Sequence, residues 1–168
     1  TAPTLTGGSL VNEHYESQYS CNCITLTDGW EAAWRQGLIV NPQPTDPRYK
    51  KLPADTLREA KIILSQTAIT SSRDELAQAQ RIEAYVQSLA RYDLNTPSMP
   101  EDQDDFALWF LREAESGYCV HYATAATVLL RAAGIPARYV EGFLAKPEAD
   151  GFAYVTGENA HAWTEVYF

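Results

Sequence analysis

The spacing of hydrophobic residues changes from a helical to a strand period near residue 135. Before Gly134, apolar residues recur every three or four positions, which predicts amphipathic helices. After Pro136 they alternate with polar residues, which predicts strands. Helices followed by strands, without strand–helix–strand alternation, indicate an α+β fold in which N-terminal helices pack on an antiparallel sheet.

Four helices are predicted between residues 53 and 133, each with a recognisable start. Proline is tolerated in a first helical turn, and Ser or Asp side chains cap free backbone N–H groups. The last helix is rich in alanine, and Gly134 ends it. The four starts are Pro53, Ser72 with Glu75 in a capping-box pattern, Asp104 or Asp105, and Cys119.

Three strands are predicted at residues 137–145, 152–156 and 160–168, with a turn at 146–151 joining the first two. Side chains alternate between the two faces of a strand. The third strand therefore has His161, Trp163 and Glu165 on one face and Ala160, Ala162 and Val166 on the other.

Residues 1–50 are predicted to form an N-terminal arm, and residues 51–168 a single domain. The arm starts with a polar stretch and continues with a short helix at 28–36 after Thr27, on which Trp30 and Trp34 share a face. A proline-rich extended connector at 41–53 then leads into the domain. The chain still has the strand pattern at Phe168, so we expect the domain to be truncated and a further strand to follow.

Composition excludes several classes of function. The 168 residues include 45% hydrophobic and 21% charged residues, which is typical of a globular protein, and the net charge of −9 argues against a nucleic-acid partner. Apolar runs are too short for membrane insertion by this chain. Cys21 and Cys23 with His14 do not make a zinc site, so we expect neither metal nor cofactor.

Cys119 is the first candidate for chemistry because it opens the alanine-rich helix. Unpaired N–H groups and the helix dipole stabilise a thiolate at that position. A free cysteine is nevertheless more often a small buried apolar residue, and position alone favours that interpretation.

A nucleophilic cysteine needs a base, and the chain has three histidines. His14 lies in the arm. His121 is about 200° around the helix from Cys119, so we expect it to point away from the thiol, at the solvent or the core edge. His161 remains, and a cysteine at a helix start with a histidine on a later strand is a recurring acyl-transfer pair.

Four blocks of sequence, in order, resemble the transglutaminase-like superfamily and are most similar to its bacterial branch. They are G-Y-C-V-H-Y-A at 117–123, L-L-R at 129–131 with G-I-P-A-R-Y-V at 134–140, E-G-F at 141–143, and H-A-W-T-E-V-Y at 161–167. The resemblance is firm over residues 104–168 and loose over 51–103.

The resemblance implies a papain-like core with Cys119 as nucleophile and His161 as base, forming a thioester with a protein or peptide substrate. A primary amine or water would then accept the acyl group, as in a transglutaminase or in a protease or amidase. Tyr118, Trp109 and Trp163 would line the cleft, although aromatic residues at such spacings are more often core.

The resemblance implies a third catalytic residue, an Asp on the strand after the histidine. We expect either that this Asp lies beyond Phe168 or that another group orients His161. Glu165 is about 13 Å along a strand from His161, too far to replace the Asp, and is better interpreted as a sheet-face or pocket charge. We therefore expect this fragment to be weakly active or inactive.

The bacterial branch also implies an extracytoplasmic domain of a membrane-anchored protein. The alternative is a noncatalytic module that uses the same fold to bind a peptide or partner. Oligomeric state is not determined by the pattern.

Overall fold

The computed structural model describes residues 46–67, 69, 73–145 and 155–168. The chain divides into two units, Thr1–Val40 and Asn41–Phe168, and the described residues all belong to the second. The predicted helix at 28–36, both arm cysteines, His14 and the turn at 146–151 lie outside the described residues.

The four predicted helices are present. They are α2 (Ala54–Ser65), α3 (Glu75–Leu89), α4 (Phe106–Arg112) and α5 (Cys119–Ala132). Asp105 caps α4 as predicted, because its carboxylate accepts a hydrogen bond from Leu108 N–H at 3.0 Å. The predicted cap of α3 was wrong: the helix begins at Glu75, and Asp74 is the N-cap, which accepts from Ala77 N–H at 3.2 Å. Ser72 itself lies outside the described residues.

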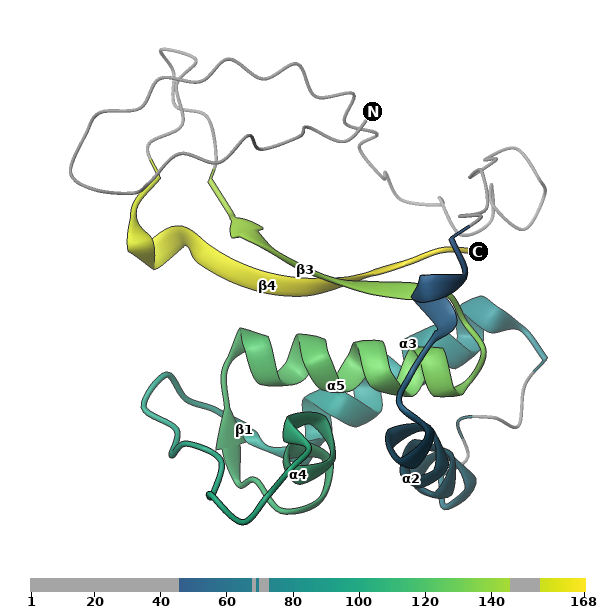
Figure 1. Cartoon of the computed structure of the whole chain (residues 1–168). Coiled ribbons are helices and arrows are strands. Elements are labelled where there is room, and N and C mark those ends of the chain that lie inside the picture. Colours follow the sequence, from purple (N-terminus) through teal and green to yellow (C-terminus); the bar gives the residue numbers. More distant parts are fainter. Residues whose placement is uncertain (1–45, 68, 70–72, 146–154) are drawn as a thin grey trace. The chain divides into compact units, whose positions relative to one another are not determined.

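Helix α5 lies between two layers, with α2, α3 and α4 on one side and the sheet on the other (Figure 1). Most of its residues are buried, and its alanines let neighbouring elements approach closely. It ends as predicted at Gly134, whose φ of 86° suits glycine, and Ile135 N–H then donates to the Leu130 carbonyl at 2.9 Å.

The sheet consists of β3 (Ala137–Phe143) and β4 (Ala160–Val166), paired antiparallel from Ala137 opposite Val166 to Phe143 opposite Ala160. The prediction joined residues 137–145 to a strand at 152–156. The joining turn at 146–151 and residues 152–154 lie outside the described residues, and the described end of the predicted strand, Val155 and Thr156, is not in a strand. A 3₁₀ turn, η3 (Gly157–Asn159), leads into β4.

A short parallel pairing, absent from the prediction, joins β1 (Arg91–Tyr92) to β2 (Ser116–Gly117). Two-residue strands are too short to leave a period in the sequence. The pairing continues as Asp93 N–H donates to the Gly117 carbonyl at 2.8 Å. It ties the segment after α3 to the residues that immediately precede Cys119.

The expected extended connector contains a 3₁₀ turn, η1 (Pro47–Lys50). The Tyr49 ring stacks on Tyr167 with 5.2 Å between centroids, and Arg131 donates to the Lys51 carbonyl at 3.2 Å. Described residues on both sides of the predicted boundary at 50 and 51 thus pack on the same unit.

Candidate active site

Cys119 is the first residue of α5, as the sequence predicted, and is a partly buried free thiol. Tyr118 before it is extended, with φ −125° and ψ −175°, and serves as the N-cap. Within the described residues no acceptor meets the backbone N–H of Cys119, so this group can donate to a bound molecule.

Gly117 lets the chain approach the core just before the cysteine. A Cβ at this position would lie 2.6 Å from Cε2 of Phe110 and 2.9 Å from Cβ of His121. Both neighbours are buried, at 1% and 3% exposure, so neither can move aside easily.

His121 lies in the core, so the prediction of a solvent-facing or core-edge position was wrong. Its ring lies among aromatic residues, with centroid distances of 4.7 Å to Phe106, 5.4 Å to Phe110 and 4.6 Å to Tyr118. Its Nδ1 accepts a hydrogen bond from Tyr118 N–H at 3.3 Å. Burial lowers the pKa of His121 below its ordinary value of 6.5.

His161 stands near the start of β4, opposite Gly142, and is partly buried. Thr164 farther along β4 donates to the Ala123 carbonyl at 2.9 Å, and Tyr167 N–H reaches Pro136 beyond the end of α5, so β4 and α5 run in the same direction. The start of β4 and the start of α5 therefore lie at the same end of the unit, as Figure 1 shows.

The two faces of β4 alternate as predicted. Ala162 is buried and Thr164 bonds to α5, whereas Glu165 pairs with Arg138 at 2.5 Å on the other face, which confirms it as a sheet-face charge. By this alternation His161 lies on the face of β4 that carries Glu165, not on the face that packs against α5. No hydrogen bond joins the side chains of His161 and Cys119 in the described structure, and catalytic hydrogen bonds are often long before substrate binds.

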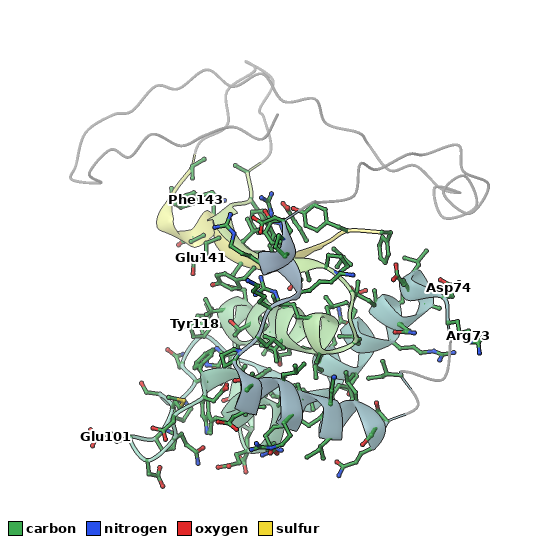
Figure 2. The ribbon with its side chains drawn as sticks, turned by 45° about the vertical axis from the view of Figure 1, so that its right-hand side comes forward. Arg73, Asp74, Glu101, Tyr118, Glu141 and Phe143 are labelled. Atoms are coloured by element: carbon green, nitrogen blue, oxygen red, sulfur yellow. The ribbon has the colours of Figure 1, made fainter. Side chains whose placement is uncertain are left out.

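Tyr139 on β3 lies near enough to Cys119 for a charge there to raise its pKa, and Glu141 is bonded to Tyr139; sequence reasoning missed both residues. The Tyr139 hydroxyl donates to the Glu141 carboxylate at 2.5 Å. Burial raises the pKa of Tyr139 most, followed by that hydrogen bond and the charges of Glu141, Cys119 and Tyr118. Figure 2 shows Tyr118 and Glu141 at the same end of the unit. Tyr139 and Glu141 are two residues apart on one strand, and this spacing was the sequence signal that could have placed them on one face.

The three aromatic residues expected at the cleft occupy different environments. Trp109 is 7% exposed and packs in the core near His121. Tyr118 and Trp163 are partly buried, and the Trp163 ring crosses Gly142, where a Cβ would lie 3.0 Å from its Cη2 atom.

Among the described residues, no group of three or more His, Cys, Asp or Glu side chains could hold a metal ion. No described helix has the length and apolar character needed to cross a membrane.

A family model described as the transglutaminase-like superfamily matches residues 63–168, which is more than half of the chain. The chain belongs to this superfamily. Its helices, the antiparallel pair β3–β4 and the cysteine at a helix N-terminus give it the α+β, papain-like fold that the sequence predicted.

Relatives of known name and structure agree with this assignment. The uncharacterized protein YebA of Bacillus subtilis is 37% identical over 129 residues, covering 72% of this chain and 17% of YebA. A protein-glutamine gamma-glutamyltransferase of Pseudomonas aeruginosa is 32% identical over 136 residues, covering 80% of this chain and 18% of that protein.

The crystal structure of the periplasmic domain of TgpA from Pseudomonas aeruginosa, bound to ethylmercury, is also similar. It superposes with a TM-score of 0.59 at 30% identity, covering 72% of this chain and 45% of that one. The chain thus spans less than a fifth of the curated relatives it matches.

Proposed function

We propose that this domain catalyses cysteine-dependent acyl transfer on protein or peptide carboxamides, with Cys119 as nucleophile and His161 as base. The observation that carries the proposal is the position of Cys119 at the start of α5 in a transglutaminase-like domain. The helix N-terminus favours the thiolate that such a reaction needs.

In the first step the Cys119 thiolate attacks the carboxamide carbon, and the Cys119 N–H donates to the oxygen that becomes negative. His161, protonated by the thiol, returns that proton to the leaving nitrogen. The C–N bond breaks, ammonia or an amine leaves, and a thioester remains on Cys119.

In the second step an acceptor attacks the thioester and releases the thiol. We favour a primary amine, which would form an isopeptide bond, because one relative carries the name protein-glutamine gamma-glutamyltransferase. Water as the acceptor would make the domain a protease or amidase. Tyr118 and Trp163 are the proposed cleft-lining side chains.

The test is incorporation of a fluorescent primary amine into a glutamine-containing protein, measured together with ammonia release. The full-length protein should give both signals, and Cys119→Ala should abolish both. Ammonia release without amine incorporation would identify water as the acceptor.

A matched control replaces Cys21 and Cys23 by Ser and should leave the activity unchanged. Activity that survives Cys119→Ala contradicts the proposal. Substrate binding without turnover in the wild-type protein favours the noncatalytic module instead.

We also propose that the domain works outside the cytoplasm as part of a longer membrane-anchored protein. The similarity to the periplasmic domain of TgpA supports this location. Fusion of a topology reporter after this domain in the full-length protein tests it, since a reporter active only in the cytoplasm should then be inactive.

A further inference from the structure

His121 is a buried imidazole that the proposed chemistry does not use. It is 3% exposed and stands two residues after Cys119 on the same helix. Burying a polar ring costs free energy unless its polar atoms are hydrogen-bonded. The contacts of His121 therefore indicate what it stabilises.

Two hydrogen bonds join His121 to Tyr118 across the first turn of α5. His121 N–H donates to the Tyr118 carbonyl at 2.9 Å, and Tyr118 N–H donates to His121 Nδ1 at 3.3 Å. The second bond is the half of a capping box in which the third helical residue reaches back to the N-cap. It requires Nδ1 to be without a proton, so the ring is neutral with its proton on Nε2.

Two other helices of this domain, α3 and α4, have a different kind of cap. Asp74 and Asp105 cap α3 and α4 with carboxylates. A carboxylate at the start of α5 would compete with the Cys119 thiolate for the N–H groups and the positive end of the dipole. A neutral imidazole secures the turn without adding negative charge there.

The surrounding core holds this imidazole in one place. Phe106 and Phe110 of α4 pack on its ring, and Gly117 provides the space beside its Cβ. We propose that neutral His121 is a positioning residue, which fixes the backbone at Tyr118 and thereby the Cys119 thiolate and its free N–H. Only the catalytic importance of this role rests on the proposed function, because the effect of His121 on the reactivity of the Cys119 thiol can be measured without turnover.

The test compares His121→Leu with His121→Asn in a chain whose Cys21 and Cys23 are Ser, so that Cys119 is the only thiol. Asn carries an acceptor oxygen where Nδ1 stands, whereas Leu keeps the bulk and has no acceptor. The readout is the rate of Cys119 alkylation by iodoacetamide as a function of pH.

We expect His121→Leu to raise the apparent pKa of the thiol and to slow alkylation at pH 7 about tenfold, the equivalent of one pKa unit. His121→Asn should restore most of the rate. Equal rates and pH profiles for Leu and wild type would overturn the proposal, as would an Asn variant that is folded and as slow as Leu.

A second measurement needs no substitution, in case the Leu variant does not fold. The nitrogen chemical shifts of the His121 ring in the wild-type protein report which nitrogen carries the proton. We expect Nδ1 to be unprotonated at pH 7; a protonated Nδ1 would refute the proposal. Neither measurement depends on turnover. Activity that survives Cys119→Ala would therefore refute the proposed acyl transfer without deciding the role of His121.

Discussion

Gly117→Ala tests whether the chain before Cys119 is as closely packed as the structure indicates. The added Cβ would meet the Phe110 ring at 2.6 Å and His121 Cβ at 2.9 Å, well inside van der Waals contact. Because both neighbours are buried, the backbone at Gly117 has to shift. Overpacking of this kind costs about 1–3 kcal/mol.

The net effect also includes the unfolded state. Replacing Gly by Ala lowers unfolded-state entropy and stabilises by about 0.4–1 kcal/mol where the native backbone permits it. We therefore expect a net loss of about 2 kcal/mol, which is the upper part of the overpacking range less the entropic gain. For a unit of this size the melting temperature should fall by roughly 8 °C.

The assay is urea unfolding followed by circular dichroism, with Gly157→Ala as the matched control. A Cβ at Gly157 meets no atom within 4 Å, so the control should remain within about 0.5 kcal/mol of wild type. If Gly117→Ala unfolds at the same urea concentration as the control, the close packing beside Cys119 is refuted.

Three further predictions concern the capping carboxylate, the buried histidine and the sheet-face ion pair. Asp105→Ala should cost about 2 kcal/mol in urea unfolding, because it removes the α4 cap and the acceptor of the Thr56 hydroxyl at 2.5 Å, whereas Asp105→Asn should cost less. The pKa of His121 is lowered in the native state, so the native state binds fewer protons than the unfolded state at mildly acidic pH. The contribution of neutral His121 to stability is therefore complete above pH 6.5 and is lost as the pH falls through the lower native pKa. His121→Asn should remove this part of the pH dependence of the melting temperature. Arg138→Gln should change stability by less than about 1 kcal/mol, and less still in high salt, because the ion pair with Glu165 is about one-third exposed; a larger change would contradict this estimate.

The helices were predictable because their signals are local. The apolar spacing after Pro53, the Asp105 cap, and the alanines of α5 ended by Gly134 all act within a few residues. The predicted start of α3 was wrong because Ser72 and Glu75 fit a capping-box pattern, whereas the helix begins at Glu75 with Asp74 as its N-cap.

Features made by distant segments were not predictable in the same way. The direct pairing of β3 with β4 depends on which strands meet, and the two-residue pairing of β1 with β2 has no period of its own. The position of Cys119 at a helix start followed from the pattern, but the surroundings of His121 did not. A helical angle gives the direction in which a side chain leaves the axis and does not identify what packs there.

The contacts of Tyr139 with Glu141 likewise required the tertiary structure. The two residues share a strand face, which alternation indicates, but their proximity to Cys119 depends on how the sheet lies over α5. Catalytic roles for Cys119 and His161 came from the family resemblance together with their positions, and they remain predictions.

The pKa of the Cys119 thiol tests the central claim most directly. It is measured from the pH dependence of iodoacetamide alkylation in the full-length protein with Cys21 and Cys23 replaced by Ser. If His161 stabilises the thiolate, the midpoint lies below the free-thiol value of about 8.5 and rises by about one unit or more in His161→Ala, while His14→Ala leaves it unchanged. A midpoint at the free-thiol value that His161→Ala does not move would contradict the pairing of Cys119 with His161.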